Sequence, residues 1–295
     1  MLLLVREFGF GCEKLRKMSS PEEIKAHLED ERSGLREQIV RTVGVHTVAL
    51  LTISRSREGE VLDLGGTGTL VSMANSHFIL TAAHVWEERL KSASDIGITL
   101  KEDIDHCCRV RVEVVTPCAL LRPEEWNEWG PDLVFLKIPD NLIGGIEAFQ
   151  SFYRLDTERA RIQADGIEVR ILMGAPHVSG KFTPIHADLN INGMFVDVNA
   201  QPYSKGEFDF IDLKEDLRLP GIPQNFGGMS GGGLWQAQIY ESSETAKIDW
   251  SWTLLGVAFH QSDVVDNHRT IRCHGPQSIG LAMKRIPVAE QPNAH

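Results

Sequence analysis

Two short stretches decide the fold that this sequence predicts. One is an apolar run that ends at a histidine, FILTAAHV at residues 78–85, and the other is a glycine-rich run around a serine, NFGGMSGGGLW at residues 225–235. Between them, an aspartate precedes a third apolar run, PDLVFLKI at residues 131–138. Short apolar runs bounded by turn residues are typical of β-strands. The three stretches thus supply His84 at a strand end, Asp132 before a strand and Ser230 in a tight loop.

Beyond residue 44 the whole chain has this short-strand character. Turn residues such as Asn192-Gly193 separate the apolar runs, and few runs have a helical period. Strands are expected at residues 45–53, 68–72, 78–81, 110–115, 133–138, 169–173, 194–198 and 254–259. Many short strands with turn signals predict an all-β barrel or sandwich. The less strand-like residues 139–166 would link two halves.

The first 43 residues differ from the rest and are set apart as an N-terminal helical extension. Residues 19–42 predict one amphipathic helix, with Ser20 as its N-cap, Pro21 at its first position and Glu23 completing a capping box. We expect this helix either to pack on the main domain or to dock a regulatory protein partner. The pattern does not separate these two roles.

Composition and charge exclude several classes of protein. Hydrophobic residues make up 42% of the chain and charged residues 24%, as in an ordinary globular protein. The net charge of -11, without a strong basic cluster, argues against a nucleic-acid partner. No run of 18 apolar residues predicts a membrane span, and the apolar run at residues 1–5 is too short for a signal-peptide core.

The five cysteines indicate a reducing compartment. Cys107 and Cys108 are adjacent, which is a poor start for a disulfide framework, so free thiols are expected in a cytoplasmic protein. His106 with these cysteines, and His268 with Cys273-His274, lack the paired spacing of structural zinc sites. No metal and no cofactor are therefore expected.

A serine, a histidine and an aspartate in one chain suggest nucleophilic catalysis. A serine hydroxyl becomes a useful nucleophile when an imidazole takes its proton, and a buried carboxylate holds that imidazole in the correct tautomer. The glycines beside Ser230 let the backbone turn sharply. The N–H groups of Gly228 and Ser230 would then converge on the oxyanion that develops on a substrate.

Each of the three residues also has a purely structural alternative. His84 would be a core histidine at a strand end, and Ser230 would stand in a glycine-rich loop that merely turns. Asp132 would be a turn residue before a strand, with Asp140 and Asp156 as the nearest substitutes for the acid.

The segments together resemble the trypsin/chymotrypsin superfamily, and its HtrA-type branch more than the digestive trypsins. The resemblance rests on residues 81–84, 132–137 and 228–232, with weaker matches at 171–176 and 255–259 and, as a closing strand, at 278–283. It covers residues 44–288 and includes no PDZ-like domain. It implies a chymotrypsin fold of two six-stranded antiparallel β-barrels, the first at about residues 44–140 and the second at about 166–288.

The resemblance implies a serine endopeptidase that cleaves polypeptides through an acyl-enzyme intermediate. Ser230 would be the nucleophile, His84 the general base and acid, and Asp132 the residue that orients His84. One alternative is a catalytically silent protease-fold module that binds peptides or partners. Another is a protease that stays dormant until a partner activates it.

Departures from the trypsin pattern bear on activation and specificity. Digestive trypsins have a cysteine after the histidine and an aspartate before the serine, where this chain has Val85 and Met229. The trypsin activation switch, which pairs a new N-terminus with that aspartate, is therefore not expected here.

The resemblance also places the substrate pocket, at Gln224, Ala258, Phe259 and His260, with Gln261 next to them in the wall strand. Gln224 stands where tryptic specificity would need an aspartate, so an apolar or small neutral residue is expected before the cleaved bond. The acidic residues 207–216 are expected to form a solvated loop near the entrance. The alternative is that Asp209 or Asp212 places a carboxylate in the pocket and selects basic substrates.

Overall fold

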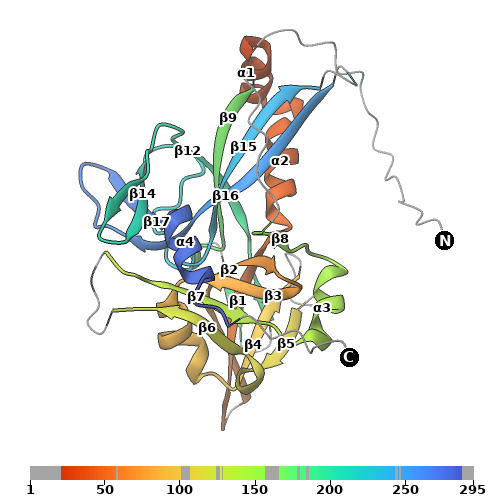
Figure 1. Cartoon of the computed structure of the whole chain (residues 1–295), viewed down its shortest axis with the longest axis vertical. Helices are drawn as coiled ribbons and strands as arrows, with labels where there is room; N and C mark the ends of the chain where they lie inside the picture. The colour runs from red at the N-terminus through yellow and green to blue at the C-terminus, as the bar shows by residue number, and fades with distance from the viewer. Residues whose placement is uncertain are drawn as a thin grey trace, which may run out of the picture.

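The computed structural model describes residues 21–57, 59–100, 107–123, 127, 129–156, 166–177, 180–183, 186–242, 245 and 247–287. Strands dominate these residues and form two large sheets, with few helices (Figure 1). The expectation of a mostly β protein is confirmed to this extent.

The first sheet contains the early strands of the chain. Its strands are β1 (Thr47–Ser56), β2 (Gly59–Met73), β3 (Ser76–Thr81), β4 (Asp95–Thr99), β5 (Cys107–Arg111), β6 (Thr116–Leu121) and β7 (Leu133–Lys137). They run antiparallel in the order β5-β4-β1-β2-β3-β7-β6, and the short β8 (Tyr153–Arg154) pairs parallel with β2.

The second sheet contains the late strands, also antiparallel. Its strands are β9 (Ile167–Gly174), β12 (Asn192–Val196), β13 (Tyr203–Lys205), β14 (Phe208–Asp216), β15 (Gly233–Glu241), β16 (Ile248–Gln261) and β17 (His268–His274). Their order is β12-β9-β15-β16-β17-β14-β13, and β10 (Lys181–Thr183) and β11 (His186–Asp188) form a separate hairpin. Among the described residues neither large sheet closes on itself, so two closed six-stranded barrels are not confirmed.

Short helices connect and cover the sheets. They are α1 (Pro21–Glu29), η1 (Glu31–Ser33), α2 (Leu35–Gly44), η2 (Val85–Arg89), η3 (Leu90–Ser92), η5 (Val112–Val114), α3 (Asp140–Glu147) and α4 (Pro276–Met283). The predicted link at residues 139–166 thus includes α3 and the strand β8.

The single N-terminal helix expected from the sequence is two helices. Gly34 adopts a left-handed conformation with φ of 67°, which an α-helix cannot continue through, and Asp30 accepts a hydrogen bond from the Arg32 N–H at the break. The proposed cap Ser20 lies outside the described residues.

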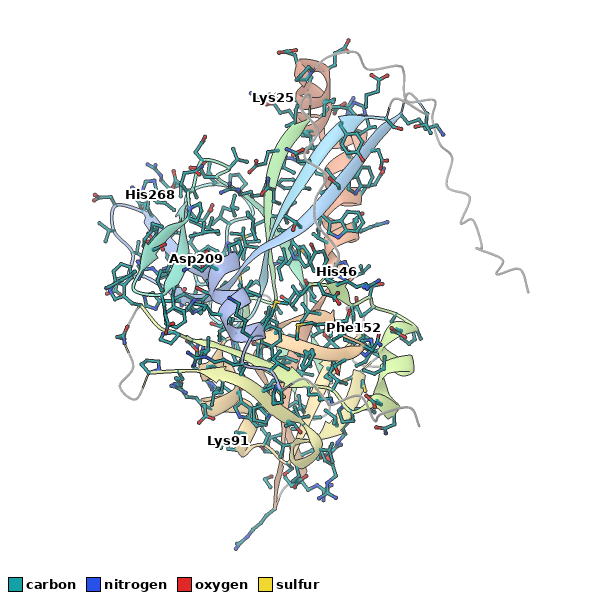
Figure 2. The ribbon with its side chains drawn as sticks, viewed as in Figure 1. Lys25, His46, Lys91, Phe152, Asp209 and His268 are labelled. Atoms are coloured by element: carbon teal, nitrogen blue, oxygen red, sulfur yellow. The ribbon has the colours of Figure 1, made fainter. Side chains whose placement is uncertain are left out.

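Two further expectations near the C-terminal half were wrong. The acidic residues 207–216 are not a solvated loop, because Phe208–Asp216 is the strand β14 in the second sheet. The expected closing strand at residues 278–283 is the helix α4, with Pro276 in its first turn. The Asp209 carboxylate, labelled in Figure 2, accepts the N–H groups of Gln277 and Ser278 and so caps this helix.

The helices α1 and α2 pack on the second sheet. Helix α1 contacts β9 and β15 and helix α2 contacts β9, as Figure 1 also shows. Their buried side chains belong to the same hydrophobic cluster as Trp235 of β15, and these are Ile24, Leu28, Leu35, Ile39 and Val43. The described part of the N-terminal extension is therefore integral to the core.

We predict that Ile39→Ala lowers the free energy of unfolding by about 2–5 kcal/mol, because truncating a fully buried isoleucine leaves a cavity. Urea denaturation followed by circular dichroism measures the change. Gln38→Ala is the matched control, since Gln38 is exposed on the same helix. Equal stability of the two variants would show that α2 does not pack as described.

Candidate active site

Asp132 holds His84 at two points. The Oδ2 atom of the carboxylate lies 2.6 Å from His84 Nδ1, and its Oδ1 atom accepts the backbone N–H of His84 at 2.8 Å. An ionised carboxylate only accepts hydrogen bonds, so Nδ1 carries the proton and Nε2 is left with its lone pair. Asp132 is buried, whereas the His84 ring is partly exposed. This arrangement leaves His84 with a proton-accepting atom on its far side.

Sheet register brings these two residues together. Strands β3 and β7 are antiparallel neighbours, and Thr81 at the end of β3 pairs with Val134 near the start of β7. His84 follows β3 by three residues, and Asp132 immediately precedes β7. Both side chains therefore lie at the same edge of the first sheet.

A second histidine lies behind the aspartate. His274 Nε2 accepts the backbone N–H of Asp132 at 3.0 Å, and the His274 ring stacks on Phe259 with centroids 4.2 Å apart. His274 is fully buried, and this burial lowers its pKa to about 4, although Asp132 and Asp209 oppose the shift. His274 is thus neutral at pH 7. Sequence reasoning missed this role, because no local pattern connects residues so far apart.

The loop around Ser230 uses nearly all its backbone donors. Five N–H groups between residues 226 and 232 have acceptors, namely those of Phe226, Gly227, Met229, Gly231 and Gly232. The N–H groups of Gly228 and Ser230 donate to no other described residue. Two donors separated by one residue are therefore available for a ligand.

Threonines of the first sheet hold this loop in place. From β2, Thr67 Oγ1 donates to the Gly228 carbonyl at 2.7 Å and Thr69 Oγ1 to the Gly231 carbonyl at 3.0 Å. The Thr67 N–H donates to the Ser230 carbonyl at 2.9 Å. Gly231 has a φ of 93°, and a Cβ there would lie 1.9 Å from the Thr67 carbonyl oxygen. This position can therefore hold only glycine.

A cavity of about 710 Å³ lies beside the loop and the His84 ring. Its lining residues are Leu64, Gly65, His84, Glu88, Arg89, His177, Asn225, Gly227, Gly228, Ser230, Phe259, His260 and Gln261. Although His84 and Ser230 share this cavity, no hydrogen bond joins them. Such contacts are commonly loose without substrate and tighten in the reacting complex.

The expected pocket residues are only partly in this cavity. Phe259 and His260 line it, whereas Ala258 is buried and its carbonyl accepts the Gly231 N–H. Gln224 is exposed outside the lining, with its Nε2 bonded to the Leu217 carbonyl. Asn225 and Gln261 line the cavity instead. Gln261 directly follows the predicted pocket residues Phe259 and His260 in the sequence, and it lines the cavity with them.

The two aspartates considered as pocket charges do not line the cavity. Asp209 caps α4, and the Asp212 carboxylate pairs with the Arg272 guanidinium at 2.8 Å. The acidic segment therefore supplies no carboxylate to the cavity lining.

The described cysteines, Cys107, Cys108, Cys118 and Cys273, are free. Burial raises the pKa of the Cys107 thiol to about 11, so it is protonated at neutral pH. The described part of the chain contains no cluster of three or more His, Cys, Asp or Glu residues suited to a metal ion. None of the described helices has the length and apolar character needed to span a membrane. Cys12 and His106 lie outside the described residues.

A scan against protein-family models gives no match, and neither does a search of curated proteins. Among solved structures, one similar chain comes from a study of how aromatic interactions drive the coupled folding and binding of the intrinsically disordered Sesbania mosaic virus VPg protein. It is 12% identical, with a TM-score of 0.38 over 77% of this chain and 85% of that chain.

Another similar structure is catalytically active tobacco etch virus protease complexed with product, also 12% identical with a TM-score of 0.38. The match covers 85% of this chain and 84% of the protease chain. At such TM-scores neither likeness bears on the function of this chain.

We predict that His274 makes the protein less stable as the pH falls from about 6.5 to about 4. Its pKa is lower in the folded state than in the unfolded state, so its contribution is full above pH 6.5 and lost as the pH falls through the folded value. The shift corresponds to about 3 kcal/mol. His46, whose pKa burial also lowers, adds to the loss in the same direction.

Urea denaturation at stepped pH values measures this dependence in the protein and in His274→Gln, which should show a shallower slope. His268→Gln is the control, because His268 is only half-buried at the start of β17, near the edge of the molecule (Figure 2). Identical slopes for the parent chain and His274→Gln would contradict the prediction, as would an NMR titration of the His274 ring with a midpoint near 6.5.

Proposed function

We propose that this chain is a serine endopeptidase with a chymotrypsin-type two-barrel domain at residues 44–288. The observation that carries the proposal is the pair of hydrogen bonds that His84 donates to the Asp132 carboxylate, at the cavity that Ser230 also lines. A carboxylate that fixes an imidazole tautomer beside a serine is the arrangement that activates a hydroxyl nucleophile.

The reaction follows from the roles of the three side chains. Ser230 Oγ attacks the carbonyl carbon of a peptide bond while His84 Nε2 takes its proton. The imidazolium, stabilised by Asp132, then gives this proton to the leaving amine, and an acyl-enzyme remains on Ser230. A water molecule, activated by the same histidine, releases the acid product and restores the serine.

The free N–H groups of Gly228 and Ser230 supply the oxyanion hole in this mechanism. The negative charge develops on the carbonyl oxygen as the tetrahedral intermediate forms, and two fixed donors stabilise it. One such donor is worth about 3 kcal/mol of transition-state stabilisation. Support comes from the neighbouring N–H groups, which are all engaged elsewhere while these two are available.

The second candidate function is a protease-fold module that binds polypeptides without cleaving them. His84 and Ser230, both in the described part of the chain, share no hydrogen bond, which is compatible with this candidate and with a dormant enzyme as well as with a substrate-free active enzyme. A dormant enzyme would need a partner, for which the N-terminal extension at residues 1–43 is the proposed docking element. In either case we propose a cytoplasmic protein, on the strength of its free thiols.

We predict that a fluorophosphonate probe labels the purified protein and fails to label Ser230→Ala. The variant should fold normally by circular dichroism and lose about 10⁶-fold in peptide turnover, as in the serine-protease template. Equal labelling of both proteins would place the nucleophile on another residue. Labelling only after addition of cell extract would identify the dormant form, and peptide binding without labelling would identify the silent module.

We predict that Asp132→Asn keeps the fold and loses about 10⁴-fold in turnover, because the amide favours the wrong tautomer of His84. Steady-state kinetics on a peptide substrate measure the loss. The matched control is Asp140→Asn, an exposed aspartate at the start of α3, which should change turnover less than about threefold. A larger loss in Asp140→Asn would show that the acid has been assigned wrongly.

A further inference from the structure

Two amide side chains meet at one side of the cavity that contains Ser230. Asn225 immediately precedes the loop around Ser230, and Gln261 is the last residue of β16. Gln261 Nε2 donates to Asn225 Oδ1 at 2.9 Å, and both residues line the cavity. The pair is therefore in a position to contact a bound substrate.

Fixed donors determine which way each amide points. Gln261 Oε1 accepts the Phe226 N–H and Arg269 Nη1, each at 3.0 Å. Asn225 Oδ1 accepts the Gly227 N–H at 2.8 Å. Because a backbone N–H and a guanidinium can only donate, the atoms facing them must be oxygens and not amide nitrogens.

These hydrogen bonds use both side-chain oxygens of the Asn225–Gln261 pair and leave some of its amide hydrogens available. Each side-chain oxygen already accepts two hydrogen bonds, which uses both its lone pairs. Both hydrogens of Asn225 Nδ2 and one hydrogen of Gln261 Nε2 have no acceptor within the described residues. These N–H groups are available to a substrate side chain that brings acceptor atoms of its own.

A cation behind the amides reinforces this selectivity. The Arg269 guanidinium donates to Gln261 and to the Gln224 carbonyl, and no carboxylate of the described residues pairs with it. Its Nε atom is buried with no partner among the described residues. The one carboxylate in the cavity lining, Glu88, forms an ion pair with Arg122. The Gln261 side of the cavity is thus short of negative charge.

We propose that this cavity selects, immediately before the cleaved bond, a side chain that ends in a carbonyl or carboxylate oxygen, as in glutamine and glutamate. The inference rests on the proposed function, because it names the substrate class of the same site. It differs from the preference for an apolar or small neutral residue that is expected from the sequence. Lysine and arginine remain excluded, since they would bring more donors and a second positive charge beside Arg269.

The test uses four peptides that differ only in the residue before the cleaved bond, which is Glu, Gln, Leu or Lys. Hydrolysis by the unmodified protein gives kcat/KM for each, and fluorescence anisotropy with Ser230→Ala gives binding of the corresponding products. We expect the Glu and Gln peptides to exceed the Leu and Lys peptides by about tenfold or more, the effect of satisfying otherwise unpaired donors.

The two readouts separate failure of this inference from failure of the proposed function. Cleavage that favours Leu or Lys overturns the inference and leaves the peptidase intact. Selective binding of Glu and Gln products without any cleavage supports the inference and overturns the peptidase. Neither binding nor cleavage of the four peptides overturns the inference.

Substitution of Arg269 tests the contribution of its positive charge. Arg269→Gln should lower kcat/KM for the Glu peptide about tenfold and for the Gln peptide less than threefold, because the charge of Arg269 acts on a carboxylate. Arg218→Gln is the control, since Arg218 is exposed and pairs with Asp216 away from the cavity. An unchanged Glu-to-Gln ratio in Arg269→Gln overturns the role of the charge.

Asn225→Asp keeps the inference testable if Arg269→Gln does not fold. Asn225 is exposed, so the substitution is compatible with folding, and it exchanges the free NH₂ donor for an anionic oxygen. We expect the Glu peptide to lose at least about tenfold relative to the Gln peptide, through repulsion between two carboxylates. An unchanged ratio would show that the substrate side chain does not reach Asn225.

Discussion

The meeting of the two halves of the candidate site depends on Thr67, through which the first sheet holds the loop around Ser230. Its hydroxyl donates to the Gly228 carbonyl and accepts the Ala175 N–H, and its own N–H donates to the Ser230 carbonyl. Thr67 is fully buried, and a buried polar group that loses its partner costs about 1–3 kcal/mol. The loop cannot shift along β2 without breaking several of these bonds together, so the position of Ser230 relative to the first sheet is fixed.

Each of the two sheets supplies a different part of the site, and the contacts of Thr67 join these parts. The first sheet positions His84 and Asp132 through the pairing of β3 with β7, and the second sheet supplies the loop. The loop is crowded against β2, which is why Gly231 has no room for a side chain. With the other N–H groups of the loop engaged, those of Gly228 and Ser230 are the two donors left for a ligand.

A neutral histidine supports the catalytic aspartate. His274 is buried under Asp132 and stays neutral, so it accepts the Asp132 N–H without adding a positive charge beside the carboxylate. The nearby acids have structural roles, since Asp209 caps α4 and Asp212 pairs with Arg272. In the Asn225–Gln261 amide pair, neighbouring donors likewise occupy both side-chain oxygens, and amide N–H groups remain available.

The sequence by itself determined the features that depend on local pattern. Alternating or continuous apolar runs marked most strands, and they placed a histidine at the end of one strand and an aspartate at the start of another. A serine with glycines on both sides indicated a sharply turned loop. These signals are readable because they arise from neighbouring residues, whose side-chain periodicity and turn chemistry fix local conformation.

Only the tertiary structure decided which distant residues meet. Asp132 and His274 are 142 positions apart, and Asn225 and Gln261 are 36 apart, so no local pattern joins them. The resemblance to the trypsin family pointed to Gln224, whereas the folded chain places its neighbour Asn225 at the cavity, beside Gln261. The helix α4 formed where a strand was expected, because a carboxylate from β14 capped it. Strand pairing, helix capping and burial involve residues far apart in the sequence, so the free energy of all contacts of the folded chain together determines them.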